Sequence, residues 1–111
     1  MDEARLADVM KALASETRLR MLALLGRHPL CAGAIARKTG ISPSAASQHL
    51  RILRSAGLVD DTRRGSHVHY SLDKERLREM EAALETLLRF GEDTPCRRPE
   101  GECDSMDADY R

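Results

Sequence analysis

The stretch ISPSAASQHLRILRSAG, residues 41–57, carries the signals of one helix with defined ends. Ser42 stands at the N-cap position, where a hydroxyl accepts a hydrogen bond from a free backbone N–H, and Pro43 suits the first helical position. Leu50 and Leu53 are spaced to face a core, and a glycine closes the stretch. We therefore predict a capped helix with a polar start and an apolar second half.

The segments on either side of this helix predict a DNA-binding architecture. CAGAIARKTG (31–40) predicts a short helix that ends at Gly40, and HPL (28–30) before it predicts a short loop. LVDDTRR (58–64) and HVHYSL (67–72) alternate as strands do, with turn chemistry between them. A short helix, a tight turn, a longer helix and a hairpin form a helix-turn-helix with a two-stranded wing.

Three further helices are predicted outside this module. Apolar spacing predicts one helix over residues 6–13 and, after a cap at Ser15, a second over 16–25. The helical period returns over 73–90, where apolar residues are spaced three, four and three apart, as in a short coiled coil. These apolar residues are Leu77, Met80, Leu84 and Leu87.

Composition sets the broad class of the protein. The 111 residues include no Trp, one Phe and two Tyr, so the core is expected to be aliphatic. We predict a mainly α fold with a small β-hairpin wing in residues 1–90, followed by a flexible, acidic, cysteine-containing tail at 91–111. No apolar run reaches the ~18 residues of a membrane span, and no signal-peptide pattern opens the sequence. We therefore expect a cytoplasmic protein with no membrane partner.

The net charge of zero hides an uneven distribution. Residues 17–71 hold nine Lys/Arg against two acids, a net charge of +7, whereas residues 91–111 hold seven acids against three arginines, a net charge of −4. A basic middle with an acidic end predicts a polyanionic partner for the middle.

The N-terminal end of the helix at 41–57 is expected to enter the major groove of double-stranded DNA. Its side chains are small or polar, Ala45 and Ala46 allow close approach, and Gln48 suits an adenine edge. The basic wing tip is expected to contact the phosphate backbone. Alternatively, the serines act only as caps and His49 is an ordinary surface residue. The predicted DNA contacts are Ser42, Ser44, Ser47, Gln48, His49, Arg51, Arg63, Arg64 and His67.

Three segments in register resemble the ArsR/SmtB family of bacterial metal-sensing repressors: ALASETRLRMLALL (12–25), CAGAIARKTGISPSAASQHLRILRSAGLV (31–59) and RRGSHVHYSL (63–72). The resemblance implies a homodimeric winged helix-turn-helix repressor that leaves its operator when an inducer binds, with no enzymatic activity and no required cofactor. It also implies dimerisation through the first and last helices. The interface residues expected on this basis are Leu6, Met10, Leu77, Met80, Leu84 and Leu87.

The resemblance also bears on the inducer. The family's zinc-type site uses Asp and His of the last helix, and residues 73–90 contain no histidine. The four-thiolate and persulfide types use cysteines that this chain lacks near its N-terminus and in its second helix. Cys31, Cys96 and Cys103 stand where arsenic-responsive members place ligands, which implies trivalent arsenic as inducer. One variant of that branch has adjacent cysteines, whereas Pro95 precedes Cys96 here.

Cys96 and Cys103 lie in the segment PCRRPEGEC (95–103). A rigid helix would hold their sulfurs ~10 Å apart, but Pro99 and Gly101 allow the segment to fold back around one ion. A tail with incidental cysteines, a redox-active disulfide, a persulfide sensor and a sensor of another soft metal remain alternatives.

Other residues allow more than one interpretation. Cys31 is either a ligand or a small buried side chain. His67 and His69 share one strand face, as metal ligands or as wing residues near DNA. Two rival classes are a thiol enzyme, which needs a base beside a cysteine, and a winged helix that binds protein. The polar helix start and basic wing favour DNA.

Overall fold

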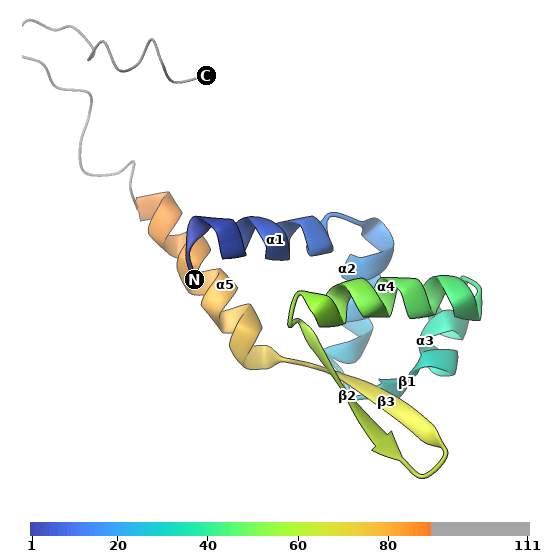
Figure 1. Ribbon diagram of the computed structural model, residues 1–111. Helices are drawn as coiled ribbons and strands as arrows, with labels where there is room; N and C mark the ends of the chain where they lie inside the picture. The colour runs from blue at the N-terminus through green and yellow to red at the C-terminus, as the bar shows by residue number, and fades with distance from the viewer. Residues whose placement is uncertain (90–111) are drawn as a thin grey trace, which may run out of the picture.

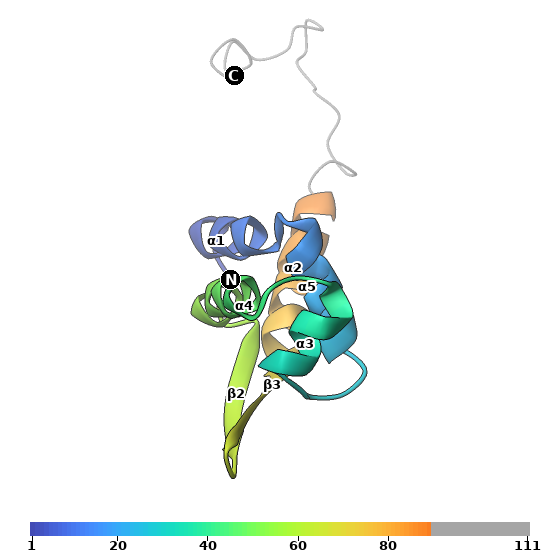
Figure 2. The same ribbon diagram turned by 90° about the vertical axis from the view of Figure 1, so that its right-hand side faces the viewer.

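The computed structural model describes residues 1–89 and confirms the mainly α fold with a wing (Figure 1). In chain order, the elements are α1 (Glu3–Leu13), α2 (Glu16–Leu25), β1 (Leu30–Cys31), α3 (Ala32–Thr39), α4 (Pro43–Ser55), β2 (Val59–Arg64), β3 (His67–Leu72) and α5 (Lys74–Arg89). The β2–β3 hairpin projects away from the helices, and α5 runs beside α1 (Figures 1 and 2).

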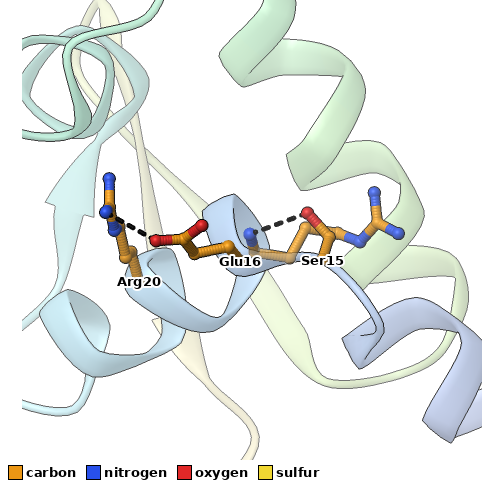
Figure 3. Close-up of polar contacts among 4 residues, drawn as sticks. Ser15, Glu16 and Arg20 are labelled. Carbon is orange, nitrogen blue, oxygen red and sulfur yellow. Dashed lines mark hydrogen bonds and ion pairs between the residues drawn. The ribbon is translucent and has the colours of Figure 1, made fainter.

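Both helix starts that the sequence placed at serines are confirmed. The Ser15 hydroxyl accepts a hydrogen bond from the Arg18 backbone N–H at 3.3 Å and caps α2 (Figure 3). The Ser42 hydroxyl accepts one from the Ala45 backbone N–H at 3.1 Å and caps α4. Each bond satisfies a donor that the first helical turn leaves unpaired.

Two glycines adopt left-handed conformations that fix the path of the chain. Gly40, with φ of 73°, ends α3 and begins the tight turn to α4. Gly57, with φ of 78°, follows α4, and a Cβ atom at this position would lie 3.0 Å from Arg76 Nε. Glycine alone adopts this backbone conformation without a steric cost, so the helix-turn-helix and the entry to the wing both depend on it.

The sheet contains one strand more than the predicted two-stranded hairpin. Leu30 and Cys31, expected at a loop end and a helix start, instead form β1, and the strand order is β1–β3–β2. β1 is antiparallel to β3, with Leu30 opposite Tyr70 and Cys31 opposite His69. A strand of two residues is too short to show an alternating pattern in the sequence. It is recognised only by its hydrogen bonds to the partner strand.

The core is aliphatic, as the composition predicts. Its fully buried members come from the four N-terminal helices and from the entry to the wing: Val9, Met21, Ile35, Leu50, Leu53, Leu58 and Val59. Ala46 is also completely buried, which corrects its expected place beside DNA. Ala46, Leu50 and Leu53 follow the helical spacing, so they form the inward face of α4.

The last helix is attached to the rest of the chain by one side only. No residue of α5 is buried, although Leu77 and Met80 pack against the core. Near its end, Leu87 is 48% exposed and Leu88 is 77% exposed. Among the described residues, no helix combines the length and the apolar character needed to cross a membrane.

Candidate nucleic-acid interface

The exposed face of α4 carries a row of polar side chains. Ser44, Ser47, Gln48 and Arg51 are all exposed, and their spacing of three, four and seven residues places them on one side of the helix. The Ser42 hydroxyl lies 3.3 Å from that of Ser44, at the start of the row. The opposite face of α4 is buried in the core, so this row points outward.

His49 differs in its surroundings from the other predicted contacts. Its side chain is half-buried, and its Nδ1 lies 3.1 Å from Arg18 Nη1. Arg18 Nε also donates to the backbone carbonyl of Ala12 at the end of α1. Sequence reasoning missed Arg18, because the two residues lie 31 positions apart and no local pattern joins them.

Two arginines and a histidine are exposed at the wing tip. Arg63, Arg64 and His67 are exposed, and Arg64 is directly opposite His67 in the register of β2 and β3. Successive residues of a strand point to opposite faces, so Arg63 and Arg64 project from the two sides of the hairpin. Within residues 1–89, neither arginine forms a salt bridge.

One ion pair joins the base of the wing to α4. Arg54 Nε lies 3.3 Å from Asp61 Oδ1 on β2. The Arg54 guanidinium partly neutralises the charge of Asp61, one of the two acids in residues 17–71. The ion pair also connects α4 to the hairpin. The cations at the wing tip remain without an acidic partner among the described residues.

The predicted thiol site is only partly within the described residues. Cys31 is half-buried and is the N-cap of α3, although its side chain forms no capping hydrogen bond. Cys96 and Cys103, and with them the predicted tail at 91–111, lie outside residues 1–89. Within those residues, no three side chains of His, Cys, Asp or Glu are grouped as a metal site.

Some of the residues predicted at a dimer interface are packed within one chain, and others are exposed. Leu6 is 5% exposed and lines a hollow of about 300 Å³ between α1 and α5, together with Leu87. Leu77 and Met80 pack on the core of the same chain, and Leu84 is half-buried. Met10 is 47% exposed, so the outer side of α1 and the end of α5 carry the accessible apolar surface.

Comparison with known proteins agrees with this architecture. Residues 15–61 match the family described as "Bacterial regulatory protein, arsR family". The transcriptional regulator CmtR of Mycobacterium tuberculosis is 36% identical over 110 residues, which cover 96% of this chain and 93% of CmtR. The transcriptional repressor SmtB homolog of Synechocystis is 44% identical over 73 residues, which cover 65% of this chain and 55% of that protein.

A solved structure extends the likeness to three dimensions. The homodimeric winged helix-turn-helix DNA-binding domain of a Mycobacterium bovis protein, determined in solution, is 33% identical with a TM-score of 0.65. The alignment covers 82% of this chain and 83% of that domain. The relatives that this chain matches are transcriptional regulators rather than enzymes. The chain therefore belongs to the ArsR/SmtB family of transcriptional regulators.

Proposed function

We propose that this protein is a homodimeric repressor that binds operator DNA through α4 and the wing and leaves it when a thiophilic inducer binds cysteine thiolates. The observation that carries the DNA-binding part is the exposed row of Ser44, Ser47, Gln48 and Arg51, together with wing-tip arginines that form no salt bridge within residues 1–89. A buried opposite face holds this row outward, as a recognition helix requires.

The two parts of this surface have different tasks. The short serines at the start of α4 allow its backbone to approach the floor of the major groove, and Gln48 can pair with the N6 and N7 atoms of adenine. Arg63 and Arg64 have long, cationic side chains on opposite sides of the hairpin, which suits contact with phosphates on either side of a groove. The helix reads the sequence, and the wing supplies affinity.

The proposed dimer rests on α1 and α5. α5 has no buried residue within one chain, and Leu87, Leu88 and Met10 leave apolar surface open to solvent. A long amphipathic helix with so little burial gains stability from a partner surface. The homodimeric M. bovis domain supports this assembly. Two recognition helices in a two-fold arrangement would then contact a palindromic operator.

For the inducer we propose trivalent arsenic, as arsenite or an organoarsenical, bound by Cys96 and Cys103, with Cys31 as a candidate third ligand. The support is the thiol content of the chain together with the preference of soft thiolates for soft or thiophilic partners. Another soft metal, or oxidation or persulfidation of the thiols, would give the same release from DNA through the same cysteines.

Release from DNA tests the inducer. Operator binding by the full chain is measured by fluorescence anisotropy with increasing arsenite, for the wild type and for Cys96→Ser, Cys103→Ser and Cys31→Ser. We expect the two tail variants to bind DNA normally but to remain bound in arsenite, because a hydroxyl is a poor ligand for a soft centre. Wild-type release in both tail variants would contradict the assignment, and the Cys31 variant decides between a two-thiol and a three-thiol site.

A further inference from the structure

A thiol and an imidazole lie on neighbouring strands of the sheet. Cys31 of β1 is directly opposite His69 of β3 in the antiparallel register. Residues opposite each other in such a pair project from the same face, with Cβ atoms about 4.5–5.5 Å apart. Both side chains are half-buried. The fold therefore places two metal-binding groups side by side, although 37 other residues separate them in the sequence.

The imidazole has an unused polar atom at this position. Among residues 1–89, His69 Nδ1 is buried and has no hydrogen-bond partner. Burial of a polar nitrogen without a partner is unfavourable, and buried polar groups in native proteins usually have a partner or a bound ion. The Cys31 side chain is also uncommitted as a cap, since it forms no capping hydrogen bond to α3.

We propose that Cys31 and His69 form a two-donor metal site that binds one Cu(I) ion through the thiolate and the imidazole. Ligand bonds of about 2.0–2.3 Å, as zinc makes to nitrogen and sulfur, are compatible with Cβ atoms at this separation. The site lies on the outer face of the sheet, which also carries Thr62 opposite His69 and His67 two residues away. It differs from the proposed arsenic site in its imidazole ligand, and it needs neither Cys96 nor Cys103.

The number and type of donors select the ion. Among residues 1–89 no third His, Cys, Asp or Glu joins this pair, whereas structural zinc sites use four protein ligands. Arsenic(III) binds thiolates in preference to imidazole, so a single sulfur with one nitrogen suits it poorly. Cu(I) is soft, binds both thiolate and imidazole, and is stable with two ligands.

A metal ion bound by this pair would connect two parts of the fold. Cys31 immediately precedes α3 of the helix-turn-helix, and His69 lies on β3, which begins beside the wing tip and runs from there toward α5. A metal bridge would therefore fix the wing against the helix-turn-helix, the two parts of the proposed DNA surface. This consequence rests on the proposed function, but occupancy of the site does not.

The test measures Cu(I) binding without DNA. The full chain with Cys96→Ser and Cys103→Ser, which keeps Cys31 as its only thiol, is titrated anaerobically with Cu(I) against a coloured competing chelator. We expect one Cu(I) per chain, with an X-ray absorption spectrum that shows sulfur and nitrogen ligands. Cys31→Ser and His69→Asn, each added to this parent, should each weaken binding by more than an order of magnitude. The matched control His67→Asn, on the same strand face, should bind as the parent does.

The outcomes separate the site from its alternatives. Equal affinity in the parent and in His69→Asn, or a spectrum with sulfur ligands alone, would mean that the thiol binds without the imidazole and would overturn the proposal. Absence of Cu(I) binding to the parent would also overturn it. Circular dichroism verifies that each variant is folded, and if His69→Asn unfolds, the spectrum of the parent decides. Operator binding is measured separately, so failure of this site leaves the repressor proposal standing.

Discussion

Arg18 Nη1 lies 3.1 Å from His49 Nδ1 and connects the start of α2 to α4. A guanidinium group only donates hydrogen bonds, so Nδ1 is the acceptor and the neutral ring carries its proton on Nε2. The same arginine donates to the Ala12 carbonyl at the end of α1. One side chain thus connects α1, α2 and α4, and it sets the orientation of His49 within the proposed DNA surface.

Replacement of Arg18 should therefore weaken folding. Arg18→Ala removes both contacts and leaves the Ala12 carbonyl without this donor, so we expect the free energy of unfolding to fall by about 1–3 kcal/mol. Urea denaturation followed by circular dichroism measures it. The matched control is Arg20→Ala, which breaks only an exposed ion pair with Glu16 (Figure 3) and should cost less than about 1 kcal/mol. Equal effects of the two substitutions would contradict the structural role given to Arg18.

A second prediction concerns Gly57 at the entry to the wing. Gly57→Ala imposes a left-handed backbone on a residue with a Cβ atom and places that atom 3.0 Å from Arg76 Nε. We expect a loss of about 1–2 kcal/mol of stability. The control, Gly33→Ala within α3, meets only the flexible end of Arg37 at 3.5 Å and should stabilise the protein by about 0.5–1 kcal/mol. Thermal unfolding shows whether each variant is more or less stable than the wild type. Unchanged stability in Gly57→Ala would contradict the account of this turn.

The sequence predicted the elements whose signals are local. The caps at Ser15 and Ser42 and the turn at Gly40 follow from a few adjacent residues, and each is present in the structure. Features that depend on distant partners were missed. β1 exists only through its pairing with β3, and the contact between Arg18 and His49 depends on how the helices cross.

The candidate site shows the same division. Helical spacing correctly indicated that Leu50 and Leu53 face the core, so the opposite row at the start of α4 was predictable as exposed. The burial of Ala46 was missed, because alanine fits a helix exterior as well as a tightly packed interior. The register that brings Cys31 opposite His69 was also inaccessible, since it requires β1 to be recognised as a strand.

The assembly of two chains provides a third test. Leu87→Glu places a charge on exposed apolar surface at the end of α5, where Leu87 is 48% exposed, and Leu84→Glu places one at a half-buried position one turn earlier. We expect both to give monomers in sedimentation velocity at micromolar concentration, because an unpaired carboxylate is costly to bury. Arg78→Glu, on the opposite side of α5, should remain dimeric. A monomeric wild type would contradict the proposed interface.

A fourth prediction concerns the ion pair at the base of the wing. Asp61→Asn removes a negative charge beside the proposed DNA surface and releases Arg54, which lies 3.3 Å from Asp61. We expect tighter DNA binding at low salt, with a steeper salt dependence because another cation becomes available to phosphates. Stability should change by less than about 1 kcal/mol, since the pair is partly exposed. Weaker DNA binding would show that Asp61 mainly positions the wing.

The central claim is that α4 reads bases while the wing binds phosphates, and a set of operator variants tests it directly. Affinities of wild type, Gln48→Ala and Arg64→Ala are measured on the chain's own promoter sequence and on its single-base substitutions, at several salt concentrations. Arg78→Ala on α5 serves as the control for lost charge.

We predict that Gln48→Ala loses about 1–3 kcal/mol at one base position in each half-site and becomes indifferent to the base there. Arg64→Ala should weaken binding to all the sequences alike and reduce the salt slope by about one for each subunit of the dimer, while Arg78→Ala matches the wild type. An unchanged base preference in Gln48→Ala, together with salt-independent affinity of the wild type, would contradict the account.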